Sequence, residues 1–120
     1  MVRISTFQEA GFCPVEWNSQ FKCAFITHSA KYALCDAAEM KQHNDSDEVF
    51  VLLAGSATLF TCENIAEKPV RCSLMPNTAY NVTAGTWHYL AVSEDAVVFV
   101  AESGSMKPEN TITSLRTFLT

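Results

Sequence analysis

Short apolar runs recur along the second half of the chain, with turn-forming residues between them. Runs of this length are typical of β-strands and too short for most helices, and they are rich in Val, Phe, Thr, Tyr and Leu. They recur at about the 8–12 residue spacing of a β-sandwich or β-barrel. The expected strands cover residues 48–53, 57–62, 70–75, 79–83, 87–92 and 96–102. The pattern therefore predicts an all-β fold for this half.

The first half and the end of the chain are less regular. Residues 22–27 have the composition of another strand, whereas residues 31–40 (KYALCDAAEM) have the composition of a helix. Residues 113–119 fit either a last strand or a tail that pairs with a second subunit. We therefore expect one helix near residue 35 in an otherwise β-rich protein.

Two of the expected strands are apolar on both faces, at residues 49–53 and 97–100. One alternate set of side chains faces the interior, and the other set must also be covered. A second sheet or a second subunit must supply that cover, and we expect a homodimer.

The chain length of 120 residues fits a single domain spanning residues 1–120. We expect a folded core at about 20–103, an N-terminal arm at 1–19 and a C-terminal strand or tail at 104–120. The formal charge of −5 and the absence of any basic run argue against nucleic acid or an anionic membrane as partners. The apolar stretches are too short to span a membrane, and the first residues lack the core of a signal peptide, so we expect a cytoplasmic protein.

The five cysteines are odd in number and widely spaced, with no Cys-x-x-Cys pair: Cys13, Cys23, Cys35, Cys62 and Cys72. This spacing predicts neither a disulfide framework nor a zinc ribbon. We interpret them as small apolar side chains within strands.

The candidate chemistry lies in the histidines. The turn Asn44-Asp45-Ser46-Asp47 separates His43 from Glu48, so we expect His43 to end one strand and Glu48 to open the next, side by side across a hairpin. With His88 as a third ligand, these residues make up a 2-His-1-carboxylate set, which holds Zn, Fe, Mn or Ni. His28 fits no such set. The alternative is that the three side chains only hydrogen-bond to one another in a polar cavity.

Two segments resemble the motifs of the cupin superfamily. Residues 43–55 (HNDSDEVFVLLAG) are similar to the first motif, G(x)5HxH(x)3–4E(x)6G, and residues 77–92 to the second, G(x)5PxG(x)2H(x)3N. The resemblance implies a small single-domain cupin-type β-barrel, of the double-stranded β-helix or jelly-roll kind. It also implies one divalent metal ion held by His43, Glu48 and His88.

The chain departs from the cupin pattern at five positions, so its first motif is degenerate. Lys41 stands where the first metal-binding His is expected. The other departures are Cys35 and Asn77 for opening glycines, Thr83 for the proline and Val92 for the last Asn. A protonated lysine cannot bind a metal ion, so the four-ligand site is reduced to three.

Three interpretations of Lys41 stay open. Its side chain turns to solvent, or it stays in the cavity as a cation for an anionic substrate or as a base, or it replaces the metal and leaves the site empty. Positions 41 and 43 share a strand face, so Lys41 faces the cavity if His43 does.

The resemblance leaves the activity open between two classes. In the first, the ion binds a small oxygen-bearing, anionic or sugar-like substrate for isomerase, lyase or dioxygenase chemistry, with Lys41 and Glu48 as candidate catalytic residues. In the second, a degenerate, metal-free cavity binds a small molecule without catalysis. In both, Lys41, Phe50, Tyr80 and Trp87 are candidate ligand contacts, and we expect Tyr89 to point away from His88.

Overall fold

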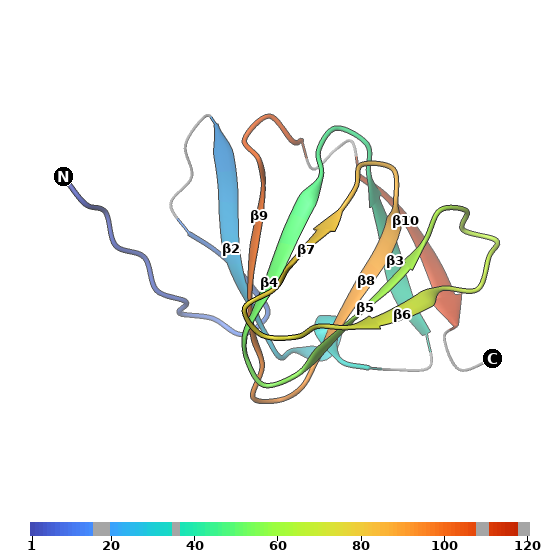
Figure 1. Cartoon of the computed structure of the whole chain (residues 1–120), viewed down its shortest axis with the longest axis horizontal. Helices are drawn as coiled ribbons and strands as arrows, with labels where there is room; N and C mark the ends of the chain where they lie inside the picture. The colour runs from blue at the N-terminus through green and yellow to red at the C-terminus, as the bar shows by residue number, and fades with distance from the viewer. Residues whose placement is uncertain (16–19, 35–36, 108–110, 118–120) are drawn as a thin grey trace.

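The computed structural model describes the chain except for residues 16–19, 35–36, 108–110 and 118–120. Its described elements are strands apart from one short 3-10 helix (Figure 1). In chain order they are β1 (Phe12–Pro14), β2 (Phe21–Thr27), η1 (Ala30–Tyr32), β3 (Ala37–His43), β4 (Glu48–Ala54), β5 (Ala57–Cys62), β6 (Val70–Ser73), β7 (Ala79–Val82), β8 (Trp87–Val92), β9 (Val97–Ser103) and β10 (Thr111–Thr117). The all-β prediction is confirmed, and the strands expected after residue 48 form within two residues of the predicted bounds.

The described strands form two sheets that face each other as the two halves of a barrel. One sheet has the order β1-β2-β9-β4-β7 and the other has the order β10-β3-β8-β5-β6. Every strand pair within them is antiparallel. The chain passes repeatedly from one sheet to the other, as in a jelly roll, so the interior receives side chains from both sheets.

The apolar interior explains the predicted alternation. Phe50 and Leu52 on β4 and Val98 and Val100 on β9 are buried in one apolar cluster between the sheets, called the first cluster. Residues at the odd positions of β4 and β9 face outward and are half-buried or exposed, with Leu53 54% exposed. The second sheet therefore covers the inner set of side chains on these strands, but it does not supply the cover that was expected for the outer set.

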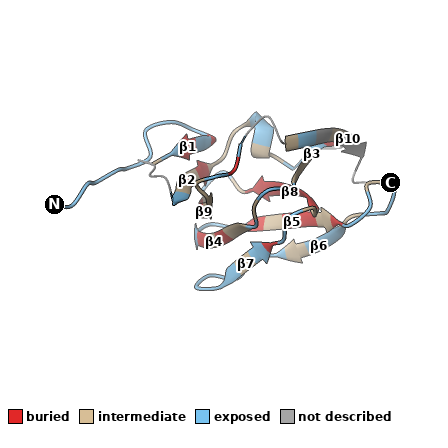
Figure 2. Ribbon diagram, turned by 90° about the horizontal axis from the view of Figure 1, so that it is seen from above, coloured by how far each residue is buried: buried red, intermediate tan, exposed pale blue. Residues whose placement is uncertain are grey.

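The opposite face of β4 and β9 is covered only in part. The N-terminal segment is exposed along residues 1–10 (Figure 2). Its Phe7 packs on Phe25 of β2 with ring centroids 5.3 Å apart, and Phe25 meets Phe99 of β9 at 5.5 Å. Three aromatic rings thus cover part of the outer face of this sheet.

The helix expected at residues 31–40 is wrong. Residues 30–32 make the single turn η1, residues 37–43 form β3, and residues 35–36, which include Cys35, lie outside the described residues. In β3, Ala38 and Met40 are buried while Glu39, Lys41 and His43 line a cavity. This period of two, which places apolar side chains on one face only, overrides the helical propensity of Ala, Glu and Met.

The segment near the C-terminus forms a strand. It starts at Thr111, two residues earlier than predicted, and pairs antiparallel with β3 of the same chain. It therefore completes the second sheet and is not a tail that pairs with a second subunit.

Two further expectations can be compared with the described residues. Cys13, Cys62 and Cys72 are free thiols, of which Cys13 and Cys62 are buried, and Cys23 is half-buried in β2. No helix within the described ranges is long and apolar enough to cross a membrane.

Candidate metal and ligand site

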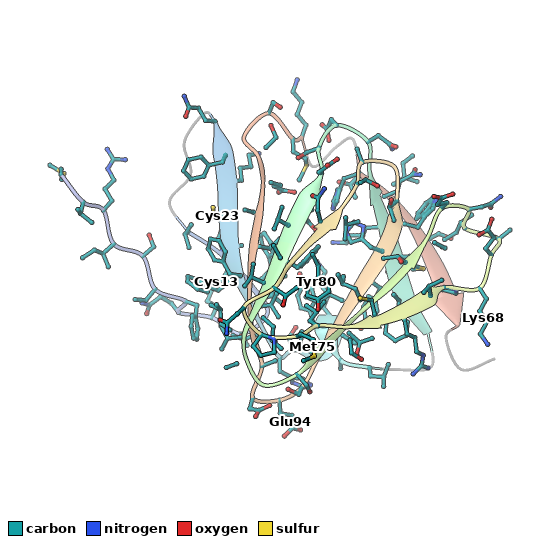
Figure 3. The ribbon with its side chains drawn as sticks, in the orientation of Figure 1. Cys13, Cys23, Lys68, Met75, Tyr80 and Glu94 are labelled. Carbon is teal, nitrogen blue, oxygen red and sulfur yellow. The ribbon has the colours of Figure 1, made fainter. Side chains whose placement is uncertain are left out.

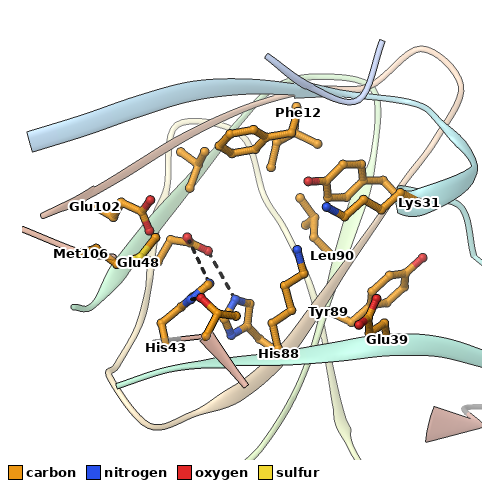
Figure 4. A pocket seen from close by; sticks show the side chains of 15 residues that line it. Phe12, Lys31, Glu39, His43, Glu48, His88, Tyr89, Leu90, Glu102 and Met106 are labelled. Atoms are coloured by element: carbon orange, nitrogen blue, oxygen red, sulfur yellow. Dashed lines mark hydrogen bonds and ion pairs between the residues drawn. The ribbon is translucent and has the colours of Figure 1, made fainter. Parts of the chain in front are cut away.

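Three predicted ligands converge inside the barrel. His43 ends β3, Glu48 opens β4 and His88 is the second residue of β8. His88 Nε2 lies 3.3 Å from Glu48 Oε1, and His43 Nε2 lies 3.7 Å from Glu48 Oε2. The side chains of all three are about nine-tenths buried, and Figure 4 shows both imidazole rings turned toward the carboxylate.

The structure corrects how His43 and Glu48 come together. β3 and β4 belong to different sheets, so the turn between them crosses the barrel instead of closing a hairpin. The carboxylate of Asp47 fastens this turn to the β7–β8 turn, since it accepts hydrogen bonds from Asn81 Nδ2 at 3.0 Å and from the Ala84 amide at 2.8 Å. The amide of Gly85 also donates to the carbonyl of His43 at 2.8 Å. The two motif-bearing turns are thus locked together, and this brings His88 to His43 and Glu48.

Hydrogen bonds at the other ring nitrogens orient both histidines. His88 Nδ1 donates to the Thr86 carbonyl at 3.1 Å, because a carbonyl can only accept. His43 Nδ1 lies 2.9 Å from the Thr111 hydroxyl on β10. Both Nε2 atoms therefore face Glu48, and such outer hydrogen bonds are usual for metal-binding histidines.

The donor set fits a divalent ion. The three side chains offer one ligand atom each, and these atoms lie within 4.8 Å of one another. An ion about 2.0–2.2 Å from each donor needs separations of roughly 3 to 4 Å between donors, which agrees with the two measured distances. Burial lowers the pKa of His43, so its imidazole is neutral near pH 7 and can bind a metal.

The carboxylate is ionised despite its burial. Burial alone would raise the pKa of Glu48, but the hydrogen bond and charge of His88 outweigh it, so the pKa is lowered. Its neighbour Glu102, directly opposite on β9, behaves in the reverse way, because burial and the Glu48 carboxylate raise its pKa to about 8. Glu102 is therefore the member of this pair that holds a proton near pH 7, and its Oε2 is buried without a hydrogen-bond partner among the described residues.

These residues line one side of a cavity of about 450 Å³, which opens between the two sheets. Its polar lining adds Lys31, Tyr32, Glu39, Lys41, Glu102 and Thr111 to the three ligands, and its apolar lining includes Phe12, Ile26, Leu90, Val100 and Met106. The cavity is large enough for a small organic molecule beside the ion.

Lys41 faces this cavity, as its parity with His43 predicts. It lies directly opposite His88 in the pairing of β3 with β8. Burial, followed by contact with the amine of Lys31, lowers the pKa of Lys41 to about 8. The interpretation in which Lys41 turns to solvent is therefore wrong.

The structure does not bring the three aromatic candidates to the cavity. Phe50 is 2% exposed in the first cluster, where its ring meets the edge of His88 at 6.2 Å between centroids. Tyr80 packs against the same cluster, and its hydroxyl accepts a hydrogen bond from the Met75 amide at 2.8 Å (Figure 3). Trp87 is buried in a second apolar cluster with Met40, Phe60, Tyr89 and others, on the opposite face of β8 from His88.

Tyr89 behaves largely as predicted. It shares the second cluster with Trp87, and its hydroxyl donates to the Ala33 carbonyl. It also borders the cavity beside Glu39 (Figure 4). The alternation of β8 thus separates His88 and Leu90 from Trp87 and Tyr89.

Sequence reasoning missed several lining residues. Glu39 lies on the same face of β3 as Lys41 and His43, so the alternation of the strand could have identified it as a lining residue. Glu102 and Thr111 reach the site only through the pairing of β9 with β4 and of β10 with β3, which no local pattern reveals. Lys31 and Tyr32 lie in η1, where a helix was expected.

Comparison with known proteins gives matches in structure alone. No protein-family model matches the chain, and no curated protein matches it in sequence. A Bacillus halodurans protein aligns over 84% of this chain and 75% of its own, with a TM-score of 0.64 and 10% identity. A cupin-2 domain containing protein from Shewanella frigidimarina aligns over 81% of this chain and 84% of its own, with a TM-score of 0.54 and 16% identity.

A third match is an enzyme. QdtA, a sugar 3,4-ketoisomerase from Thermoanaerobacterium thermosaccharolyticum in complex with TDP, aligns over 75% of this chain with a TM-score of 0.60 and 18% identity. The chain spans 64% of the length of QdtA. These identities show a shared fold, in agreement with the motif spacing and the jelly-roll strand order. The chain therefore has a fold of the cupin type.

Proposed function

We propose that this protein binds one divalent metal ion through His43, Glu48 and His88 and holds a small oxygen-bearing molecule in the adjoining cavity. The observation that carries the proposal is the convergence of three oriented donors: both Nε2 atoms meet one ionised carboxylate inside a cavity. Zn, Fe, Mn and Ni all accept this set of ligands.

Within this proposal, the chemistry favoured is an isomerisation. The metal would polarise a carbonyl or hydroxyl oxygen of the bound molecule as a Lewis acid. Lys41 faces the same cavity with a pKa of about 8, near the value at which a side chain both accepts and donates protons at neutral pH. A keto-hydroxy isomerisation needs such a proton carrier, and the fold match to QdtA, a sugar 3,4-ketoisomerase, supports this reaction class over a lyase or a dioxygenase.

The alternative is a metal-free cavity that binds a small molecule without catalysis. It is favoured by Lys41 at the position of the first metal-binding histidine, because a cation beside the site opposes a second cation. In that case the Glu48 carboxylate pairs with the imidazoles of His43 and His88, and no ion lies between them.

A cobalt(II) titration followed by visible absorption separates these two functions. The metal-binding function predicts d–d bands that saturate at one equivalent and are lost in His88→Ala. His28→Ala is the matched control, since His28 does not line the cavity, and should titrate like the wild type. Absence of the bands in the wild type would leave the metal-free alternative.

We also propose that the protein is a homodimer through the outer face of the sheet β1-β2-β9-β4-β7. Leu53 and Phe21 are 54% and 49% exposed there, and the exposed N-terminal segment carries Val2 and Ile4. Sedimentation of the full chain should give twice the monomer mass, and Leu53→Lys should shift it toward the monomer. A monomeric wild type would contradict this assembly.

A further inference from the structure

Two lysine side chains meet in the cavity beside the donor set. Lys41 comes from β3 and Lys31 from η1, and both line the cavity. The two side chains are close enough for the charge of Lys31 to act on Lys41. Lys31 also lies 5.7 Å from the ring centroid of Tyr32.

Among the described residues, no carboxylate forms an ion pair with either lysine. Within the described part of the chain, the ion pairs of the cavity join Glu48 to the two histidines and include neither lysine. Glu39 and Glu48 act on Lys41 through their charge. The pair therefore places two cationic side chains, of which Lys31 is exposed and Lys41 half-buried, at one cavity of a protein whose net charge is −5.

An anion bound between the two amines would offset the repulsion between their positive charges. Two like charges in contact repel each other, and an anionic group bound between them accepts a charge-assisted hydrogen bond from each. The apolar walls formed by Phe12, Ile26 and Leu90 strengthen such interactions, because they lower the local dielectric. Figure 4 shows Phe12, Leu90 and Lys31 among the side chains around the cavity.

The lysine pair lies next to the donor set. Lys41 and His43 are two residues apart on one strand face, which separates their backbones by about 7 Å. Lys41 also lies directly opposite His88. One small molecule can therefore reach both the lysine pair and the donor set.

We infer that Lys31 and Lys41 form an anion subsite, which holds a carboxylate or phosphate group of the ligand while an oxygen at its other end faces His43, Glu48 and His88. The metal-facing half of this inference rests on the proposed function. The substrate class is therefore a small organic acid or a small phosphorylated molecule, and not a neutral sugar.

Calorimetry at low ionic strength tests the subsite directly, with inorganic phosphate, succinate and glucose as probes. The full chain is titrated metal-free and zinc-loaded, as wild type, Lys31→Met, Lys41→Met and Lys68→Met. Lys68 is the matched control, because it is an exposed lysine on the loop between β5 and β6, far from the cavity (Figure 3). Circular dichroism checks that each variant is folded.

The subsite predicts that phosphate or succinate binds the wild type and that either cavity variant weakens it by about tenfold or more, as expected for loss of a hydrogen bond between charged groups. Lys68→Met should bind as the wild type does, and glucose should not compete. Whether phosphate or succinate binds more tightly identifies the anionic group of the ligand.

Three outcomes would overturn the subsite: neither anion binds the wild type, the cavity variants bind as the wild type does, or Lys68→Met weakens binding equally. Zinc titration of the same proteins keeps the two proposals apart. Zinc binding with no lysine-dependent anion binding refutes the subsite and leaves the metal site standing. Lysine-dependent anion binding to a wild type that takes up no zinc refutes the metal site alone.

Discussion

The hydroxyl of Thr111 provides a test of how the site is oriented. Thr111 Oγ1 lies 2.9 Å from His43 Nδ1 and is supplied by β10, a strand outside both cupin motifs. When His43 binds a metal through Nε2, its Nδ1 carries the proton and donates to this hydroxyl. Thr111→Val keeps the shape of the side chain and removes the acceptor, so the ring loses the bond that fixes its tautomer and direction.

The expected effect is on metal affinity more than on stability. Loss of an outer hydrogen bond to a metal-binding histidine typically costs 10- to 100-fold in affinity, or about 1.4 to 2.7 kcal/mol. His88 is unaffected, because its Nδ1 donates to a backbone carbonyl that no substitution removes. The free energy of unfolding of the metal-free protein should fall by only about 1 kcal/mol, since one partly buried hydrogen bond is lost.

Zinc affinity is measured by competition with a chromophoric chelator, for the wild type, Thr111→Val and Thr111→Ser. The serine variant keeps the hydroxyl and should stay within about threefold of the wild type, a difference of less than 1 kcal/mol. Wild-type affinity in Thr111→Val would refute the view that β10 orients His43.

Three further predictions concern other parts of the molecule. Lys41→His should tighten zinc binding in the same competition assay, because position 41 faces the cavity opposite His88, and no gain would argue against that geometry. Urea unfolding of the metal-free protein should show stability falling as pH rises from about 4.5 to about 8, since folded Glu102 keeps a proton that the unfolded chain releases, and Glu102→Gln should remove most of this slope. Gly55→Ala should lower the free energy of unfolding by about 2 kcal/mol or more, because φ is 68° and a Cβ would lie 2.6 Å from Ala96 Cα, and an unchanged melting temperature would contradict this.

The strands after residue 48 were predictable because their signals are local. Each has apolar and polar residues in a period of two or an uninterrupted apolar run, and each ends at a turn residue such as Gly55 or Gly85, both of which have positive φ. The same alternation is present in β3, but the Ala, Glu and Met residues of that segment obscured it. Propensity is a weak signal there, since burial on one face of the sheet decides the structure.

The donor set was predictable for a different reason. His43, Glu48 and His88 have the spacing of two cupin motifs, and the structure brings their ligand atoms together. The rest of the cavity depends on which strands become neighbours. Glu102 lies opposite Glu48, and Thr111 lies opposite His43, only after the sheets have formed.

The aromatic candidates show the limit of choosing residues by type. Phe50, Tyr80 and Trp87 lie within or beside the motif segments, but their large apolar surfaces are used in the two apolar clusters. Burial of such side chains contributes strongly to stability wherever they occur, so an aromatic residue near a motif does not by itself predict a ligand contact.

Metal content tests the central claim most directly. Elemental analysis by mass spectrometry is made on untagged protein, purified without chelators or added metal, with His88→Ala and the His28→Ala control purified in parallel. The account predicts close to one equivalent of zinc, iron, manganese or nickel in the wild type and in His28→Ala, and loss of the metal in His88→Ala. A wild type that holds no metal and takes up none on titration, or a His88→Ala variant with undiminished metal, would contradict it.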